Sequence, residues 1–379
     1  MRITERTGLE RLFHALRDDG YTLVGPTIRD QAVIYDEIES IDDLPAGWTD
    51  HQDAGTYRLE RRNDDRLFGY TLAVQSWKRF LFPPAERLFG VERHDGNPQL
   101  IPEGPVDERF AFIGVRACEL HAIEIQDRVF LSGTSIDPQY KSRRERAFIV
   151  AVHCAEAADT CFCQSMGTGP MVNRGFDLAL TELVDHNSHR FLVQAGSRSG
   201  ERVLDRLAFD QADEDEVVRG EMQTANALSQ SRHMPRTVEL RELLQPNLEH
   251  RHWESIASRC LSCANCTMVC PTCFCSTVED TTDLTGDHAE RWRKWDSCFT
   301  LDFSHIAGGS IRQSTKSRYR QWLTHKLCNW HDQFGVSGCV GCGRCITWCP
   351  VGIDLTAEIA AMQADCHAPA PSQTPREGE

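Results

Sequence analysis

Residues 260–271 read CLSCANCTMVCP, and residues 339–350 read CVGCGRCITWCP. Both stretches have the spacing Cys-x2-Cys-x2-Cys-x3-Cys-Pro, and they form the one internal repeat that we find in the sequence. Three cysteines at intervals of three residues let each thiolate reach a different iron of one compact cluster, and the proline then turns the chain away. The repeat therefore predicts a pair of metal centres in the C-terminal part of the chain.

The same spacing is typical of ferredoxins that hold two clusters, in which the fourth cysteine of each motif ligates the cluster of the other motif. This crossing predicts two 4Fe-4S clusters, the first held by Cys260, Cys263, Cys266 and Cys349 and the second by Cys339, Cys342, Cys345 and Cys270. Structural zinc is the alternative, but zinc gives no role to the third evenly spaced cysteine or to the Cys-Pro pair. The motif form favours clusters.

The chain of 379 residues is longer than most single hydrophobic cores can support, so we expect two domains. The expected fold class is α+β. An N-terminal α/β domain with a mixed or parallel sheet (residues 1–240) precedes a mainly helical, dicluster ferredoxin-like domain (residues 241–365) and a disordered tail (residues 366–379). The long insert between the two motifs, Thr272–Gly338, favours a helical rather than a compact ferredoxin arrangement.

Local patterns support this division. The continuous apolar runs in Arg109–Val115 and Arg146–Cys154 predict two buried parallel strands. The Pro83–Pro84 pair predicts a rigid turn into a short helix, and we find no strand pattern beyond the domain boundary.

Composition excludes several classes of protein. The net charge of -15 disfavours a nucleic-acid binder, because such surfaces need lysine and arginine to neutralise phosphates. We find neither an apolar run of the ~20 residues that cross a bilayer nor a signal-peptide pattern, so we expect a cytoplasmic protein without membrane insertion. The 17 cysteines are odd in number and lie in a long chain, which favours metal binding over disulfides.

Several phrases of the sequence together resemble one family. They are FPPAERLFG, GVRACELHAIEIQDRVFL, CFCQSMGTGP, CPTCFC, WDSCF, RYRQWLTHK and CVGCGRCITWCPVGID. These phrases resemble the beta subunit of cytosolic sulfhydrogenases, which are NAD(P)-linked nickel-iron hydrogenases, in a family that includes the electron-transfer subunit of anaerobic sulfite reductase. The resemblance extends from about Tyr21 to Asp354.

The resemblance implies a non-catalytic electron-transfer subunit of an oxidoreductase complex. Its partners would be a flavin-containing subunit that oxidises NAD(P)H, and the small and large subunits of a nickel-iron hydrogenase. The catalytic subunit of a sulfite reductase is the alternative partner. A hypothesis of another class is a self-contained reductase whose α/β domain binds a flavin or a small substrate; GTGP at Gly167–Pro170 leaves a weak anion site open, although no GxGxxG follows a strand.

Nine cysteines remain outside the two motifs, and we interpret Cys328 and Cys366 as ordinary thiols. Cys118 and Cys154 each follow a predicted strand, at the edge where parallel sheets bind ligands, and could form a third metal site with Cys161 and Cys163. That site would be a third iron-sulfur cluster or a zinc site, with His121 or His153 as a substitute ligand. The alternative is a set of reduced thiols packed at a domain interface.

A second set of unassigned cysteines follows the first motif. Cys273, Cys275 and Cys298 are expected to lie beside the cluster ligands and to tune the reduction potential through S–H hydrogen bonds, without binding metal. A site shared by the two TCFC copies, at residues 160–163 and 272–275, is a further alternative.

Overall fold

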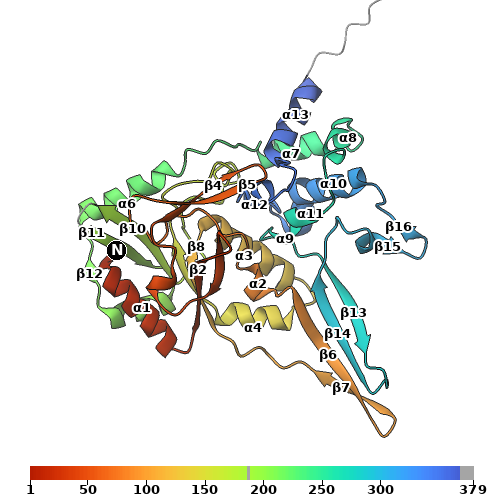
Figure 1. The fold of residues 1–379 in the computed structure, drawn as a ribbon, viewed down its shortest axis with the longest axis horizontal. Helices are drawn as coiled ribbons and strands as arrows, with labels where there is room; N and C mark the ends of the chain where they lie inside the picture. Colours follow the sequence, from red (N-terminus) through yellow and green to blue (C-terminus); the bar gives the residue numbers. More distant parts are fainter. Residues whose placement is uncertain (186–187, 368–379) are drawn as a thin grey trace, which may run out of the picture.

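The computed structural model describes residues 1–185 and 188–367, and its largest element is a mixed sheet of eight strands (Figure 1). In spatial order the strands are β12 (Asp210–Gln211), β1 (Arg2–Glu5), β11 (Ser188–Ala195), β10 (Leu178–Asp185), β9 (Phe148–Val152), β8 (Phe110–Val115), β2 (Thr22–Arg29) and β3 (Ala32–Glu37). The four central strands, β10, β9, β8 and β2, run parallel to one another. The strands on either side of these four pair in antiparallel fashion.

The two predicted buried strands are confirmed as β8 and β9. Every residue of both strands is buried, and the strands pair in parallel with Ile113 opposite Val150. A strand covered on both faces has no polar side to show, which is why its sequence is a continuous apolar run. The prediction of a mixed α+β fold is confirmed as well.

Helices cover the faces of this sheet. Helix α1 (Arg6–Asp18) packs on α5 (Arg198–Leu207) and on strands β2 and β11, and it buries Leu9, Leu12, Phe13 and Leu16 at helical spacing. Helix α6 (Glu214–Asn226) packs on β10 and β11. The other helices of this half are α2 (Lys78–Leu81), α3 (Ala117–Phe130) and α4 (Pro138–Arg146), with a 3-10 turn at Ile41–Asp43 and a separate hairpin of β4 (Trp48–Asp53) and β5 (Thr56–Arg61).

A second sheet of four antiparallel strands forms an arm that extends away from the main sheet (Figure 1). It joins distant parts of the chain, since β6 pairs with β14, and its strands in spatial order are β13 (Ser276–Thr282), β14 (His288–Trp295), β6 (Ala85–His94) and β7 (Asn97–Pro102). Two expectations were therefore wrong. A strand, not a helix, follows Pro83–Pro84, and strands do occur beyond the domain boundary. The reason is that β6 and β14 satisfy each other's backbone groups across the two halves, and ion pairs such as Arg87–Glu290 (2.7 Å) support the pairing.

The remaining C-terminal part is built mainly of short helices. They are α7 (Thr237–Leu244), α8 (His252–Ala257), α9 (Asn265–Met268), α10 (Thr315–Thr324), a π-helical turn at His325–Asn329, α11 (Trp330–Phe334), α12 (Arg344–Thr347) and α13 (Leu355–His367). A 3-10 turn at Asp302–Ser304 and a small hairpin of β15 (His305–Ile306) and β16 (Gly309–Ser310) precede α10. Helix α13 includes the first two residues of the stretch 366–379 that we predicted as a tail, and residues 368–379 lie outside the described residues. Within the described ranges, every helix is too short or too polar to cross a bilayer.

A buried ion pair connects the two halves. Arg344, in the second cysteine motif, pairs with Glu119 of α3, and both side chains are 1% exposed. Arg344 also donates to the carbonyl oxygen of Ala73 (2.8 Å). The second motif is therefore anchored on the N-terminal half by charge-assisted contacts that water does not screen.

Candidate metal centres

The first ferredoxin group, defined as Cys260, Cys263, Cys266 and Cys349, lines an apolar cavity. Phe299, Tyr319 and Trp322 form part of the wall of this cavity. Ser262 N donates to Cys260 Sγ (3.4 Å), and Ile353 N donates to Cys349 Sγ (3.3 Å). Thiol donors around an apolar space, with backbone N–H groups directed at sulfur, fit a 4Fe-4S cluster.

The charges of these thiols also fit a metal cluster. Burial raises the pKa of the Cys266 thiol well above its usual value, and the nearby thiols of Cys260, Cys349 and Cys263 raise it further. Buried thiolates repel one another and need a cationic partner, which iron supplies when a cluster binds.

The second ferredoxin group, defined as Cys339, Cys342, Cys345 and Cys270, is brought together across the two motifs. Burial raises the pKa of Cys345, and the thiols of Cys339, Cys342 and Cys270 raise it further. Gly341 N donates to Cys339 Sγ (3.4 Å). Cys270 thus lies beside the second motif and Cys349 beside the first, whereas the ligation of a cluster by either group stays a prediction.

Lys326 is a component of the second site that sequence reasoning missed. Its buried Nζ donates to Cys270 Sγ (3.2 Å), Thr272 Oγ1 (3.0 Å) and the carbonyl oxygen of Gly338 (3.0 Å). A hydrogen bond from the Cys273 thiol, together with the charge of Lys326, holds the pKa of Cys270 well below its usual value. In the sequence, Lys326 lies in a basic stretch of the kind that usually faces solvent, so no local pattern marks it as buried.

The N-terminal cysteine group, defined as Cys118, Cys154, Cys161 and Cys163, also converges. Burial raises the pKa of Cys118, and the thiols that add most to the shift are Cys163 and Cys342. Burial likewise raises the pKa of Cys161, with Cys163 and Cys154 adding to the shift. The group therefore lies next to Cys342 of the second ferredoxin group.

The two histidines considered as substitute ligands make other contacts. His153 Nδ1 accepts a hydrogen bond from Val172 N (3.2 Å), and His121 faces Glu124 (3.6 Å). Within the described residues, no set of three or more His, Cys, Asp or Glu side chains has the geometry that holds a single metal ion.

The first TCFC copy, Thr160–Cys163, packs directly on the second motif. Phe162 N donates to the carbonyl oxygen of Gly341 (2.9 Å), and Thr168 Oγ1 donates to that of Val340 (2.6 Å). Gln230 Nε2 donates to Cys163 Sγ (3.1 Å). These contacts position the N-terminal cysteine group against the second ferredoxin group.

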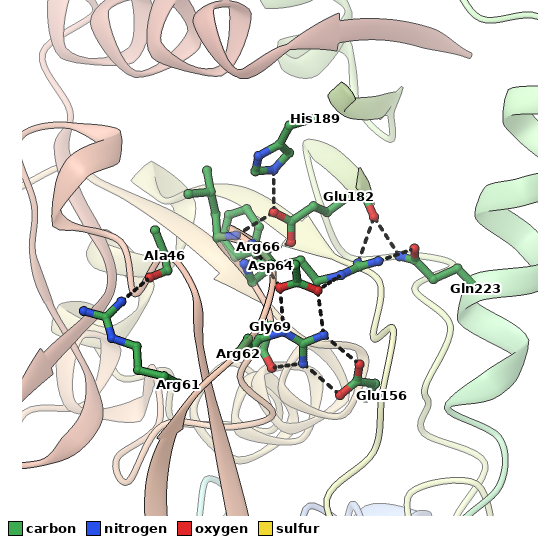
Figure 2. Close-up of polar contacts among 12 residues, drawn as sticks. Ala46, Arg61, Arg62, Asp64, Arg66, Gly69, Glu156, Glu182, His189 and Gln223 are labelled. Atoms are coloured by element: carbon green, nitrogen blue, oxygen red, sulfur yellow. Dashed lines mark hydrogen bonds and ion pairs between the residues drawn. The ribbon is translucent and has the colours of Figure 1, made fainter. Parts of the chain in front are cut away.

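A network of polar contacts holds the segment between Cys154 and Cys161 (Figure 2). Figure 2 shows Arg62 between Asp64 (2.8 Å) and Glu156 (3.1 Å). Arg66 donates to the Glu182 carbonyl oxygen (3.2 Å) on β10 and to Gln223 Oε1 (3.0 Å) on α6. The loop after β5 thus contacts both the segment between Cys154 and Cys161 and strand β10 of the main sheet.

Comparison with known proteins identifies a cluster-binding domain and a family. Residues 259–353 match the family model of a 4Fe-4S dicluster domain, a range that includes both ferredoxin groups. Over 307 residues the chain is 34% identical to sulfhydrogenase 2 subunit beta of Pyrococcus furiosus, covering 79% of this chain and 86% of that protein. The chain belongs to the sulfhydrogenase beta subunit family. The resemblance that its motifs predict is therefore confirmed, and no solved structure matches the chain.

In this family member the other cysteines occupy distinct surroundings. The Cys270 thiol raises the pKa of Cys273, and the Cys298 thiol lowers the pKa of Cys275, so each of these thiols lies near its neighbour. Cys328 is buried among the C-terminal helices, and Cys366 is exposed on α13. The motifs in the sequence predict the iron-sulfur centres, but the sequence does not predict where these extra thiols lie.

Proposed function

We propose that the chain is an electron-transfer subunit that relays electrons between a flavin subunit that oxidises NAD(P)H and a catalytic nickel-iron hydrogenase subunit. The observation that carries this proposal is the succession of cysteine groups. The N-terminal cysteine group adjoins the second ferredoxin group at Cys342, and the thiol of Cys345 in the second group lies near Cys266 of the first. Neighbouring centres of this kind form a path for single electrons.

In this proposal the two ferredoxin groups each hold a 4Fe-4S cluster, and the N-terminal cysteine group holds a third. Iron-sulfur clusters accept and release one electron at a time without moving substrate atoms. The protein supplies buried thiolates, N–H and lysine donors to sulfur, and an apolar surrounding, all of which adjust the reduction potential. Residues 1–240 would form the domain of the third cluster, and residues 241–365 the domain of the other two.

The position of the first ferredoxin group suggests where electrons cross to a partner. Cys263 is exposed, whereas Cys339 and Cys342 of the second group are buried. The relative in Pyrococcus furiosus is named as a sulfhydrogenase subunit, which supports hydrogenase small and large subunits as the partners. We therefore expect a partner centre to dock over Cys263.

The relay is tested by anaerobic copurification of the chain with the products of neighbouring genes, followed by iron and sulfide analysis and EPR-monitored redox titration. We expect about twelve irons per chain for three 4Fe-4S clusters. Copurification with a sirohaem reductase instead of a hydrogenase would show that the partner is a sulfite reductase.

Variants assign the centres. Changing Cys118 and Cys154 to serine should remove about four irons and leave the two ferredoxin clusters. Changing Cys263 or Cys342 to alanine should abolish NAD(P)H-dependent reduction of the partner. Unchanged iron in the first variant would refute the third cluster, and retained partner reduction in the second would refute the relay.

A further inference from the structure

Arg116 is anchored beside two members of the N-terminal cysteine group. It precedes Cys118 by two residues, at the start of α3. Its Nη1 donates to the carbonyl oxygen of His153 (3.2 Å), and His153 is the residue directly before Cys154. Arg116 therefore lies between the backbone segments that carry these two cysteines.

The other cysteines of the group reach the same place from a different loop. A Cβ atom on Gly169 would lie 3.1 Å from Cys163 Sγ and 3.3 Å from Ala117 Cβ. The Cys163 sulfur is therefore packed beside the residue that follows Arg116. One buried apolar cluster includes Cys118, Cys161 and Cys163.

The Arg116 guanidinium is buried, and one of its donors is left over. The side chain is 1% exposed, and its Nη2 donates to the carbonyl oxygens of Phe68 (2.9 Å) and Tyr70 (2.7 Å). Its Nε is buried without a hydrogen-bond partner in the part of the chain that the structure describes. Because a buried donor without an acceptor is unfavourable, this N–H indicates an acceptor that the polypeptide itself does not supply.

The charge of Arg116 also lacks a counter-charge. Its side chain donates to carbonyl oxygens, and among residues 1–185 and 188–367 no carboxylate forms an ion pair with it. The carboxylate of Glu119 on the same helix pairs with the equally buried Arg344. Asp50 is buried too, but its Oδ1 accepts a hydrogen bond from Thr71 N (2.6 Å). A guanidinium stays protonated when buried, so Arg116 needs an anion close by.

The cysteines beside Arg116 can supply that anion. Burial raises the pKa of the Cys154 thiol, and the Arg116 guanidinium opposes this rise. Thiols lose their protons when a metal centre binds them. A four-iron cluster held by four thiolates carries net negative charge, and this charge grows by one unit on reduction. Such a group fits a buried cation that has a free N–H.

We propose that Arg116 is the counter-charge of an iron-sulfur cluster held by the N-terminal cysteine group. Its guanidinium balances the negative charge of the thiolates and the cluster, and its Nε supplies the N–H that no protein acceptor takes. Apolar surroundings disfavour the more highly charged, reduced state, and Arg116 offsets this effect and so raises the reduction potential. The inference rests on the proposed function, because that function places a third cluster in this group.

The test compares the full-length, cluster-loaded chain with Arg116→Met under anaerobic conditions. The EPR signal of the third cluster is the one that disappears when Cys118 and Cys154 are both changed to serine. We expect Arg116→Met to keep about twelve irons per chain. In a redox titration, its third cluster should have a reduction potential lower by about 59 mV, which equals a tenfold shift toward the oxidised state.

Two further variants separate charge from packing. Lysine keeps the positive charge, so Arg116→Lys should lower the potential by less than half as much as Arg116→Met. Arg143→Met is the matched control, because Arg143 is also buried but has a counter-charge in Glu86 (2.6 Å). This control should keep the potential of the parent chain.

The outcomes distinguish this role from a structural one. An unshifted potential in Arg116→Met, or an equal fall in either of the other two variants, would overturn the proposal. If Arg116→Met loses the third cluster, Arg116→Lys decides: about twelve irons there would support charge balance, and loss of iron there as well would overturn it in favour of a steric role. A parent chain with only about eight irons would instead contradict the third cluster of the proposed function, and with it the role of Arg116.

Discussion

At the scale of single residues, a few buried charges connect the centres to the fold. The Glu119 carboxylate accepts hydrogen bonds from Tyr35 Oη (2.9 Å), Trp77 Nε1 (2.9 Å) and the backbone N–H of Arg116 (3.1 Å), in addition to its ion pair with Arg344. These donors satisfy a carboxylate that has lost nearly all contact with water. Such a network is stabilising only while every member is present.

Replacing Glu119 by glutamine should therefore destabilise the protein. The amide keeps the shape of the side chain but leaves the Arg344 guanidinium buried without a counter-charge, at a cost of about 3 kcal/mol. The expected result is a lower midpoint of thermal unfolding, measured anaerobically by circular dichroism. Asp107→Asn, which removes an ion pair to Arg146 from a side chain that is 94% exposed, should leave the midpoint unchanged. Equal midpoints for Glu119→Gln and the parent chain would contradict this role.

Lys326 should control the potential of the second cluster. Replacement by methionine removes the N–H···S contact to Cys270 and the positive charge beside it, so the more negative, reduced cluster becomes less stable. We expect the reduction potential to fall by about 60 mV, which equals a tenfold change for a one-electron couple. EPR during redox titration measures it. Lys316→Met, which removes an ion pair to Glu254 (2.8 Å) near the surface, is the control. An unshifted potential in Lys326→Met would refute the assignment.

At the scale of elements, the close contact between two loops joins the N-terminal cysteine group to the second ferredoxin group. Gly341 has a φ of +64°, and a Cβ atom there would lie 2.6 Å from the carbonyl carbon and oxygen of Phe162 and 2.7 Å from Cys163 Cα. Only glycine allows both this backbone conformation and this approach. The glycine in the motif thus serves packing between the halves as well as access to sulfur.

Gly341→Ala should separate the two loops and release iron from both adjoining centres. We expect a loss of about four irons or more per chain, measured with sulfide on anaerobically purified protein. Gly286→Ala is matched, because its φ of +74° is similar but no atom lies within 4 Å of the added Cβ. That control carries only the backbone cost of about 1 kcal/mol and should keep its iron. If both variants keep the iron of the parent chain, close loop packing is not needed to hold these clusters.

At the scale of the whole molecule, the C-terminal half depends on the N-terminal half for structure. Strand β14 pairs with β6, Arg344 pairs with Glu119, and Lys78 approaches Cys273 across the same boundary. Removing the N-terminal half would leave an unpaired strand edge and buried charges without partners.

A fragment of residues 241–379 expressed alone should therefore fail to form a stable, cluster-loaded protein. Without β6 and Glu119, we expect it to aggregate or to bind little iron, whereas the full chain prepared in parallel holds its clusters. Circular dichroism and iron analysis provide the measurement. A folded fragment with about eight irons, the content of two 4Fe-4S clusters, would contradict this dependence.

The sequence by itself determined the local features of this protein. The cysteine spacing predicts which thiols belong to each ferredoxin group, and the apolar runs predict β8 and β9, because both signals depend on residues close together in the chain. Only the tertiary structure decided that residues 85–94 form a strand with β14 and that Lys326 is buried beside Cys270. Each of these depends on contacts between segments far apart in sequence, and local periodicity carries no record of which distant segment will supply the missing hydrogen-bond or charge partner.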